Sequence, residues 1–287
     1  MLVYLRVKSD TRMNDKSLKA AVLGYPIAHS LSPVLHGKAF EVLGIVGSYE
    51  AIEVESGGLS EFLKGKGQNY DYLSLTMPLK EEVLDIAKES NIDVDELAKR
   101  IQSVNTLVRK GTGWSATSTD GSGFIKALAN AGYDHFNSVL ILGAGGTARA
   151  VAGALDDIAE SVSIMGRSVR RNAGIAACFR KVSPEFIVWD DQIDLRQFDL
   201  IVNTTPSGAA DLVAENIPSK VEGLLFDVLY KPWPTLIARR WSDGGGKLVS
   251  GLELLLYQGI DQINIVHPLG REIIDDQLRA ALNNASK

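Results

Sequence analysis

A glycine-rich stretch that follows a short apolar run is the pattern in this sequence with the most specific chemistry. Val139–Leu142 is continuously apolar, as expected of a strand buried on both faces of a parallel sheet. Gly143 allows a tight turn, Gly145 lets the backbone approach a pyrophosphate, and Ala148 suits close packing of helix on strand. Thr147–Leu155 then reads as a helix whose N-terminus offers free N–H groups to phosphates. The pattern predicts a dinucleotide-binding turn, with an ordinary tight turn as the alternative.

The residues after the next expected strand indicate which dinucleotide this turn would hold. Val162–Met165 would be the second strand of the nucleotide fold, where an NAD-binding protein usually carries Asp or Glu for the ribose 2′-hydroxyl. Here the strand is followed by Gly166-Arg-Ser, with Arg170 and Arg171 close behind. No carboxylate is present to repel a 2′-phosphate, and a guanidinium is its natural partner. The pattern favours NADP, and a solvated basic turn is the alternative interpretation.

Several other polar residues could act in a site but have ordinary explanations when they are taken singly. Lys80 lies in the first turn of an expected helix, where it opposes the helix dipole, so a surface lysine paired with acidic neighbours is the simpler interpretation. Asp120 stands just before a helix and would serve as its cap, and Ser32 would cap the helix that Pro33 begins. Asn203-Thr-Thr-Pro-Ser-Gly follows an apolar strand at the sheet edge where ligands bind, although an ordinary turn also fits.

The expected elements carry these residues on an α/β fold, because apolar runs of strand length alternate with helical segments. The expected strands are Leu18–Leu23, Ser48–Val54, Tyr72–Thr76, a hairpin of Val104–Val108 with Trp114–Ala116, and then Val139–Leu142, Val162–Met165, Leu200–Val202, Leu224–Phe226 and Lys247–Val249. The expected helices are Pro33 to Leu43, Leu59–Leu63, a helix opened by Pro78, Gly121–Ala131, Thr147–Leu155, Leu252–Val266 and Gly270–Asn283. The stretch Pro184–Gln197 is ambiguous.

The length of 287 residues favours two domains. We expect an N-terminal α/β substrate-binding domain made of residues 1–119 and 252–287, and a Rossmann-like nucleotide-binding domain made of residues 120–251. In this arrangement Leu252–Val266 crosses back from the second domain, and Gly270–Asn283 docks on the first.

The composition limits the partners of the protein. Hydrophobic residues make up 45% of the chain, which is typical of a soluble globular protein, and no apolar stretch approaches the length of a membrane span. The formal charge of -5 argues against broad binding to nucleic acid or to anionic membranes. Cys178 is the only cysteine, so an intramolecular disulfide and a thiolate metal site are excluded, and His29 and His36 fit structural roles better than metal binding. We expect a cytoplasmic protein in which Met1–Lys16 is a frayed extension and Met13 is an alternative start.

Taken in order, the motifs are far more specific than any one of them. The chain carries Gly24-Tyr-Pro-Ile-Ala-His-Ser-Leu-Ser-Pro, Leu75-Thr-Met-Pro-Leu-Lys, Val104-Asn-Thr-Leu, Thr119-Asp-Gly, Gly143-Ala-Gly-Gly-Thr-Ala-Arg-Ala, Asn203-Thr-Thr-Pro, Asp227-Val-Leu-Tyr-Lys-Pro and Gly251-Leu through Gln258-Gly. From Lys19 onward nearly the whole chain resembles the shikimate dehydrogenase family. The resemblance implies a reversible, NADPH-dependent reduction of 3-dehydroshikimate to shikimate in aromatic amino-acid (chorismate) biosynthesis.

The resemblance also implies a role for each motif. Lys80 and Asp120 would be the catalytic pair: a hydride that arrives at a ketone leaves an alkoxide, which needs a proton or a cation beside it, and a lysine held by a carboxylate supplies both. The residues that would hold the substrate are Ser30 and Ser32 at its carboxylate, Thr76, Asn105 and Gln258 at the ring hydroxyls, and Ser74 and Tyr230 in the same pocket. The residues that would hold NADP are Gly143, Ala144, Gly145, Gly146, Thr147, Ala148, Arg167, Ser168, Arg171, Thr204, Thr205, Pro206 and Gly251.

Some positions depart from the family pattern. Ser74 stands in place of Asn, Gly37 in place of Asn, Ala116 and Ser118 in place of Gly and Asn, Gly166 in place of Asn, and Val266-His-Pro in place of Trp-Thr-Gly. Because Ser74 lies in the expected substrate pocket, quinate or a related polyol acid becomes a more plausible substrate. The oligomeric state is left open by the sequence, with a homodimer as one outcome.

Three other functions stay open as alternatives. The first is a quinate/shikimate dehydrogenase with relaxed substrate or cofactor choice. The second is a non-catalytic NADP-binding regulatory protein on the same scaffold, against which the intact Lys80, Asp120 and Asn105 argue. The third is another two-domain NADP enzyme such as a folate-type dehydrogenase, which the Ser30-Leu-Ser-Pro motif disfavours.

Overall fold

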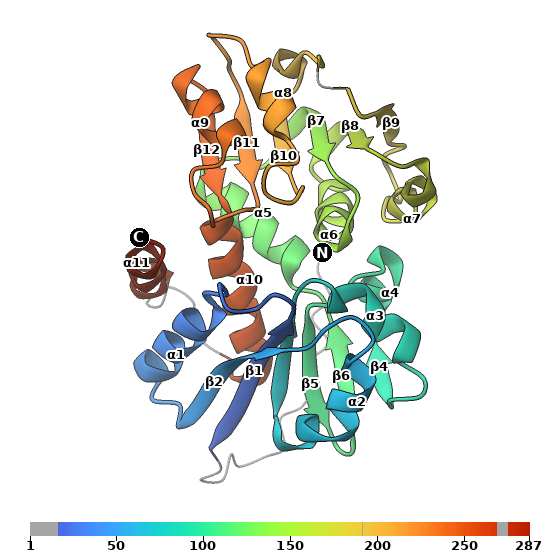
Figure 1. Ribbon diagram of the computed structural model, residues 1–287, viewed down its shortest axis with the longest axis vertical. Coiled ribbons are helices and arrows are strands. Elements are labelled where there is room, and N and C mark those ends of the chain that lie inside the picture. Colours follow the sequence, from blue (N-terminus) through green and yellow to red (C-terminus); the bar gives the residue numbers. More distant parts are fainter. Residues whose placement is uncertain (1–16, 191, 269–274) are drawn as a thin grey trace.

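The alternating apolar and helical segments fold into two six-stranded sheets in the computed structural model, which describes residues 17–190, 192–268 and 275–287 (Figure 1). The first sheet has the strand order β2-β1-β3-β5-β6-β4, with β1 (Leu18–Gly24), β2 (Gly47–Glu53), β3 (Tyr72–Leu75), β4 (Ile92–Val94), β5 (Thr106–Lys110) and β6 (Gly113–Thr117). Its strands β1, β2 and β3 are parallel, whereas β5 runs antiparallel to both β3 and β6. The predicted hairpin is therefore confirmed.

The second sheet is entirely parallel and has the strand order β12-β11-β10-β7-β8-β9. Its strands are β7 (Phe136–Leu142), β8 (Ala159–Gly166), β9 (Glu185–Val188), β10 (Leu200–Asn203), β11 (Leu224–Asp227) and β12 (Lys247–Ser250). Val139–Leu142 is at most 1% exposed, and its side chains alternate between two apolar cores, one on each face of the sheet. The continuous apolar run is thus explained by burial on both faces, and the predicted α/β fold is confirmed.

Helices cover the faces of both sheets and also connect them. They are α1 (Ser32–Leu43), α2 (Leu59–Lys64), α3 (Leu79–Ile86), α4 (Glu96–Ile101), α5 (Asp120–Asn130), α6 (Gly146–Leu155), α7 (Asn172–Ala176), α8 (Asp211–Glu215), α9 (Leu236–Asp243), α10 (Gly251–Val266) and α11 (Asp275–Ala285). Short 3₁₀ turns lie at Lys66–Asn69, Val169–Arg171 and Leu195–Gln197. The ambiguous stretch Pro184–Gln197 contains β9 and the last of these turns.

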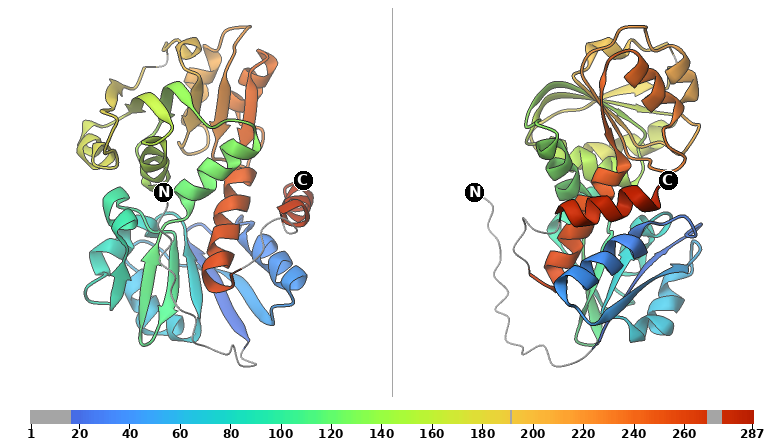
Figure 2. Two further views of the ribbon diagram at one scale, coloured as in Figure 1. Left: turned by 180° about the vertical axis from the view of Figure 1, so that it is seen from behind. Right: turned by 90° about the vertical axis from the view of Figure 1, so that its left-hand side faces the viewer.

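Two helices, α5 and α10, lie side by side between the sheets (Figure 2). They approach closely at Gly123, where an ideal Cβ would lie 2.6 Å from the backbone nitrogen of Gln258. Since α5 follows the first sheet and α10 follows the second, this contact fixes how the two sheets face each other. Within the described residues, α11 packs against α1 and α10, which confirms the predicted docking of the C-terminal helix. The N-terminal expectation for Met1–Lys16 and the beginning of the predicted helix at Gly270 lie outside the described residues.

Two predicted helix caps are wrong. Helix α1 begins at Ser32 itself, with Leu31 as its cap residue, and the Ser32 side chain makes no capping hydrogen bond. Helix α5 begins at Asp120, with Thr119 as its cap residue, and again no side chain caps it. Each residue is the first residue of its helix, whereas the capping interpretation places it just before the helix. Both side chains are therefore left for other contacts.

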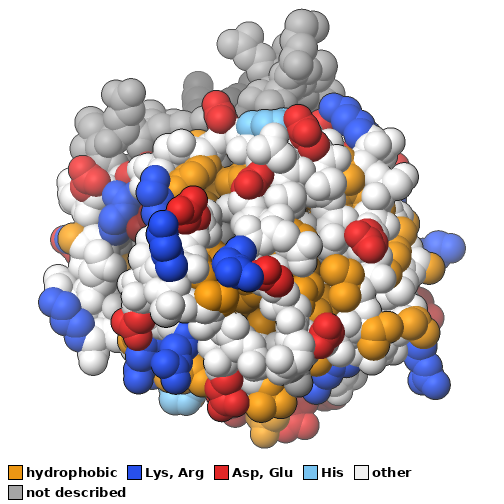
Figure 3. All heavy atoms as spheres, turned by 90° about the horizontal axis from the view of Figure 1, so that it is seen from above, with side chains coloured by type: hydrophobic (Ala, Val, Ile, Leu, Met, Phe, Trp, Pro, Cys, Tyr) orange, Lys and Arg blue, Asp and Glu red, His pale blue; other side chains and the backbone are white. Residues whose placement is uncertain are grey.

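Charged side chains of both signs lie on the face at the far end of the second sheet (Figure 3). Figure 3 shows the face at the top of Figure 1, where acidic and basic side chains are interspersed over the second sheet and its helices. No helix in the described part of the chain is long and apolar enough to cross a membrane.

Candidate active site

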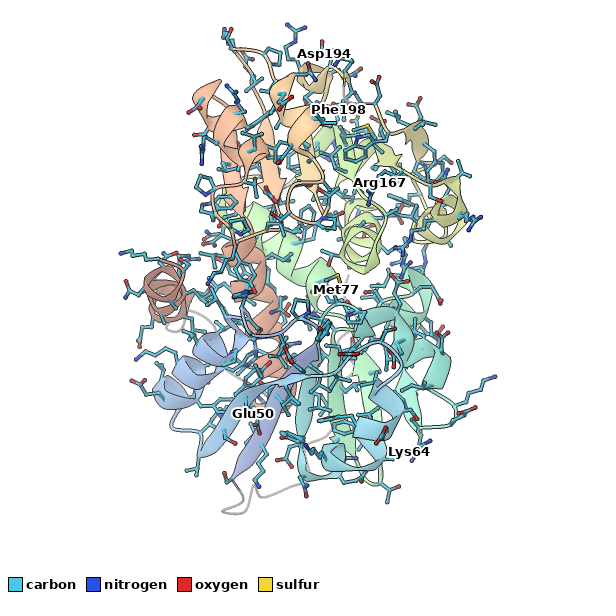
Figure 4. All side chains as sticks on the ribbon, viewed as in Figure 1. Glu50, Lys64, Met77, Arg167, Asp194 and Phe198 are labelled. Atoms are coloured by element: carbon cyan, nitrogen blue, oxygen red, sulfur yellow. The ribbon has the colours of Figure 1, made fainter. Side chains whose placement is uncertain are left out.

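The beginnings of α3, α5 and α6 lie in the region where the two sheets face each other (Figure 1). The glycine turn that follows β7 lies against α3, since an ideal Cβ on Gly146 would lie 3.6 Å from Cβ of Lys80 and 3.1 Å from Oγ of Ser103. Met77, which is 63% exposed, points into the same junction from the residue before Pro78 (Figure 4). Ligands of open α/β sheets bind at the carboxyl ends of the strands. The junction is therefore the candidate active site.

Lys80 and Asp120 form an ion pair in this junction. Lys80 comes from the first turn of α3 and Asp120 begins α5, and Nζ of Lys80 lies 2.5 Å from Oδ2 of Asp120. The two side chains are 17% and 5% exposed, so the pair is largely shielded from water. A carboxylate at the start of a helix is favoured by the helix dipole. The interpretation of Lys80 as a surface lysine paired with its neighbours is thus wrong, and Glu82 instead accepts the amide N–H groups of Gly57 and Leu59.

Asn105 holds the second oxygen of Asp120. Its Nδ2 donates to Oδ1 of Asp120 at 2.8 Å and to Oε1 of Gln258 at 3.1 Å. Its Oδ1 accepts the backbone N–H of Thr119 at 2.9 Å. All four of these residues are buried. We call Lys80, Asp120, Asn105, Thr119 and Gln258 the polar cluster; its hydrogen bonds join the starts of α3 and α5 to β5 and α10.

Of the predicted carboxylate ligands, Ser30 lies in the loop before α1 and Ser32 is the first residue of that helix. Ser30 is half-buried and its Oγ accepts the backbone N–H of Ser32 at 3.3 Å. Tyr230, from the loop after β11, reaches the same loop: burial raises the pKa of Tyr230, and a hydrogen bond with the backbone of Leu31 opposes that rise. Thr76 is half-buried directly after β3, and its carbonyl accepts the N–H of Leu79 at the start of α3. Tyr230 therefore joins a loop of the second sheet to the loop that carries Ser30.

Ser74 takes a different place from its expected neighbours. It is 5% exposed, its Oγ accepts the hydroxyl of Tyr49 at 2.7 Å, and the same Oγ donates to Oε1 of Gln262 at 2.8 Å. The Ser74 hydroxyl is thus engaged inside the protein. Neither Tyr49 nor Gln262 stands out in the sequence, and the one available signal is that Gln262 follows Gln258 by one helical turn.

The ring of His36 packs against Tyr49, the residue that donates to Ser74. It stacks on Tyr49 with 4.0 Å between ring centroids, and its Nδ1 is hydrogen-bonded to the hydroxyl of Tyr72 at 2.6 Å. Burial lowers the pKa of His36 to about 3, so the ring is neutral at physiological pH. These contacts support the structural role expected for His36. Across the described ranges of the chain, no group of three His, Cys, Asp or Glu side chains is placed to hold a metal ion.

The glycine turn has the backbone that its sequence predicts. Gly143 has a φ of +106°, and an ideal Cβ there would lie 2.6 Å from Oγ1 of Thr204, so only glycine fits. Gly145 is the cap residue of α6 and no side chain caps this helix, so its first N–H groups point out unpaired by side chains. Ala148 is fully buried against the core. Ala144, Gly146 and Thr147 complete the turn, which we call the cofactor turn (residues 143–148).

Arginine side chains lie beside the cofactor turn. Arg171 donates from Nη1 to the carbonyl of Ala144 at 3.2 Å, and Gly166 at the end of β8 lies next to the same alanine. Arg167 is exposed at the end of β8 (Figure 4). Ser168 is turned to a local role, since its Oγ accepts the backbone N–H of Arg170 at 3.3 Å.

A buried arginine that the sequence analysis does not single out also lies here. Arg149 on α6 is 8% exposed and donates to the carbonyls of Ile101 and Gln102 at 3.0 and 2.7 Å, at the end of α4. Its guanidinium also pairs with Glu81 at 2.9 Å, and Arg171 lies 3.7 Å from the same carboxylate. Arg149 and Glu81 therefore tie the cofactor turn to α3, next to the polar cluster.

The loops after β10 and β11 form the rest of this edge. Asn203 accepts the hydroxyl of Thr205 at 2.7 Å and donates to Asp227 at 3.1 Å, while Thr204 donates its hydroxyl to the carbonyl of Leu142 at 2.8 Å. Burial raises the pKa of Asp227. Pro206 is exposed at the tip of the loop, and Gly251 begins α10 against the backbone of Val228.

These residues fit an NADP molecule. The glycine with positive φ lets phosphates approach the backbone, the uncapped start of α6 offers N–H donors, and arginines lie where an acidic residue would mark NAD. The fold and the site together define a two-domain α/β protein of the dinucleotide-dependent oxidoreductase class, with a lysine–aspartate pair between a cofactor turn and a serine-lined loop.

Comparison with known proteins narrows this class. The family model for the shikimate dehydrogenase substrate binding domain matches residues 22–107. The chain is 35% identical over 254 residues to the shikimate dehydrogenase (NADP(+)) of Methanococcoides burtonii, covering 85% of this chain and 90% of that protein. The crystal structure of shikimate 5-dehydrogenase from Thermus thermophilus in complex with NADP(H) and shikimate has a TM-score of 0.81 at 33% identity, covering 93% of this chain and 99% of that one. The chain belongs to the shikimate dehydrogenase family.

Proposed function

We propose that this protein is an NADP-dependent shikimate dehydrogenase, which reversibly reduces 3-dehydroshikimate to shikimate in aromatic amino-acid biosynthesis. The observation that carries the proposal is the buried pair of Lys80 and Asp120, 2.5 Å apart and directly beside the cofactor turn. The family of the chain and its relatives named as NADP(+) enzymes support it. A solved neighbour that holds both shikimate and NADP(H) supports the same pairing of substrate and cofactor.

In this reaction NADPH, when bound, supplies the hydride. Lys80 as an ammonium ion stabilises the negative charge that develops on the carbonyl oxygen and donates a proton to it. Asp120 accepts one N–H of Lys80 and so fixes its direction, while Asn105 holds the other oxygen of Asp120. Because these groups are hydrogen-bonded to one another in the folded protein, little reorganisation is needed at the moment of reaction.

The substrate is oriented by neutral donors. Ser30 and Ser32 hold its carboxylate, and Thr76, Asn105 and Gln258 hold its ring hydroxyls, with Tyr230 closing the pocket from the second sheet. Asn105 and Gln258 are hydrogen-bonded to each other at 3.1 Å, and Asn105 is also bonded to Thr119 and Asp120, so the directions of both carboxamides are fixed. Ser74 contributes from beneath, through its hydrogen bonds to Tyr49 and Gln262.

The cofactor is held mostly by backbone. Residues 143–148 take the pyrophosphate, Arg167 and Arg171 take the 2′-phosphate, Ser168 supports that turn, and Thr204, Thr205, Pro206 and Gly251 line the nicotinamide side. The corresponding domains are residues 1–119 with 252–287 for the substrate and residues 120–251 for NADP. A single buried cysteine supports a cytoplasmic location, and a homodimer is the oligomer to test against a monomer.

The test is a four-way assay of the purified full chain, in which formation of reduced cofactor is followed with shikimate or quinate and with NADP⁺ or NAD⁺. The proposal predicts the highest kcat/KM with shikimate and NADP⁺. Preference for quinate, or equal use of NAD⁺, would favour the relaxed quinate/shikimate enzyme. Binding of NADP⁺ without turnover of either acid would favour the regulatory protein and overturn the proposal.

A further inference from the structure

Gln262 is a fully buried polar side chain that is not among the predicted substrate-binding residues. It lies on α10 one turn after Gln258 and is 1% exposed. Both ends of its carboxamide are used: Oε1 accepts the hydroxyl of Ser74 at 2.8 Å, and Nε2 donates to Oγ1 of Thr106 at 2.8 Å and to the carbonyl of Asn105 at 3.0 Å. A helix of the second half of the chain thus reaches into the first sheet.

The carboxamide bridges a cross-strand pair. Ser74 on β3 lies directly opposite Thr106 on β5 in the antiparallel register, and side chains opposite each other on one face of a sheet are neighbours. The two hydroxyls are joined through Gln262, which accepts from Ser74 and donates to Thr106. The carboxamide of Gln262 therefore lies between the side chains of Ser74 and Thr106, on one face of the paired strands.

The bridge continues to the catalytic carboxylate. Thr106 donates its hydroxyl to Oδ1 of Asn105 at 2.7 Å, and Nδ2 of Asn105 donates to Asp120 at 2.8 Å. Gln262 touches neither Lys80 nor Asp120, so it acts through Asn105. Its loss would leave the hydroxyl of Thr106 and the backbone carbonyl of Asn105 without their donor, and so weaken the support of Asn105.

Ser74 is also the position at which the sequence departs from the family pattern, which has Asn there. An asparagine at 74 would carry a carboxamide on β3, opposite Thr106, in the space that the Gln262 carboxamide now fills. The two carboxamides cannot occupy that space together, because Oγ of Ser74 already lies 2.8 Å from Oε1 of Gln262 and 2.7 Å from the Tyr49 hydroxyl.

We propose that Gln262 is a positioning residue of this protein, whose carboxamide supplies from α10 the group that an asparagine at position 74 would supply from β3. The inference rests on the proposed function for its kinetic effect but not for its structural one. It makes a reciprocal prediction: either single change is harmful, and the two together are better than either alone, since residues that share one space couple strongly.

The experiment compares Ser74→Asn, Gln262→Ala and the double variant by kcat and KM for shikimate, KM for NADP⁺, and thermal unfolding. Gln262→Ala should lower kcat about tenfold or more, as expected when buried donors and acceptors lose their partner. The KM for NADP⁺ should not change, because the cofactor turn does not contact this bridge. The double variant should regain most of the lost kcat and unfold at a higher temperature than either single variant.

Asp261→Ala is the matched control. Asp261 is the preceding residue on α10 and bonds to Ser122 and Lys126 on α5, away from the bridge. Its loss should lower stability without lowering kcat, and Ser74→Asn should not rescue it. A double variant no better than its poorer single parent in both kcat and unfolding temperature would overturn the proposal. If the wild type does not turn over shikimate, the proposed function fails, and the unfolding temperatures alone decide this inference.

Discussion

The junction has two sides, which we call the first-sheet wall and the second-sheet wall, and they differ in the groups that they present. On the first-sheet side, the candidate site consists of side chains that are buried and hydrogen-bonded to one another, from Lys80 and Asp120 through Asn105 to Gln258. On the second-sheet side, the cofactor turn consists of backbone, with exposed side chains such as Arg167 at its edge. The first wall is held together by its own hydrogen bonds, whereas the second offers N–H groups and charge.

The two walls should therefore be sensitive to different kinds of substitution. A wall of coupled side chains is damaged by removing any one member, because the remaining partners are left buried and unsatisfied. A wall of backbone is damaged chiefly by adding atoms or by changing φ, and loss of an exposed charge has a smaller effect. Substitutions on the two sides should therefore differ both in size and in which kinetic constant they change.

The largest effect is expected for Lys80→Ala. Removal of a positioned acid–base group commonly lowers rates by about 10²–10⁴, so kcat with shikimate should fall within that range while NADP⁺ still binds. The measurements are steady-state kinetics and NADP⁺ titration by fluorescence. Lys99→Ala, which breaks an exposed pair with Glu96, is the matched control and should leave kcat unchanged. Near-normal turnover of the Lys80 variant would remove this lysine from the mechanism.

Gly143→Ala should be the most damaging change on the cofactor side. Its φ of +106° and the 2.6 Å approach of Thr204 Oγ1 force the turn to move, at a cost of about 1–3 kcal/mol. We expect a lower unfolding temperature and NADP⁺ affinity reduced about tenfold or more. Gly174→Ala is the control, since an added Cβ there meets no atom within 4 Å and its φ is not positive. If both variants bind NADP⁺ like the wild type, the turn does not hold the phosphates.

The buried His36 makes the free energy of unfolding depend on pH. Its pKa is about 3 in the folded protein against 6.5 in the unfolded chain, so below pH 6.5 the unfolded state binds a proton that the folded state does not. The stability that this histidine contributes is complete above pH 6.5 and falls by about 1.5–2 kcal/mol as the pH drops to 5. Urea unfolding at several pH values, compared with His36→Gln, isolates this contribution. Parallel stability curves for the two proteins would show that burial of His36 does not shift its titration.

Arg167→Ala tests the exposed edge of the cofactor turn. Hydrogen bonds to charged groups contribute about 1.5–3 kcal/mol, so NADP⁺ should bind about tenfold more weakly or worse, while use of NAD⁺ changes little. Arg239→Ala, an exposed arginine on α9, is the control and should alter neither cofactor. Equal losses with NADP⁺ and NAD⁺ would remove Arg167 from 2′-phosphate recognition.

Most of the fold could be predicted because its signals are local. The apolar runs of β7, β10 and β11 and the largely apolar helix α10 are clear in the sequence, and their observed bounds differ by a few residues at most. The three-residue strand β4 and the short helices α4, α7 and α8 escape notice, since so few residues carry no periodicity. The eight-residue helix α9 is also missing from the expected elements.

The site could be predicted only in part. The glycine turn and the order of the motifs predict the cofactor turn and single out Lys80 and Asp120. The residues that support them, such as Tyr49, Arg149 and Gln262, act through contacts that only the tertiary structure creates. Ser32 and Asp120 show the opposite error, since their residue types favour a local capping role that the structure does not use.

The side chains of the first-sheet wall are expected to act as one unit in catalysis. The most direct test is a double-mutant cycle in kcat with shikimate and NADP⁺, using Lys80→Ala, Asp120→Ala and the double variant, each shown to be folded. Residues that act as a unit are strongly non-additive, so the double variant should be little worse than its poorer single parent. If the two single-variant losses in kcat simply multiply in the double variant, Lys80 and Asp120 act independently and not as one unit.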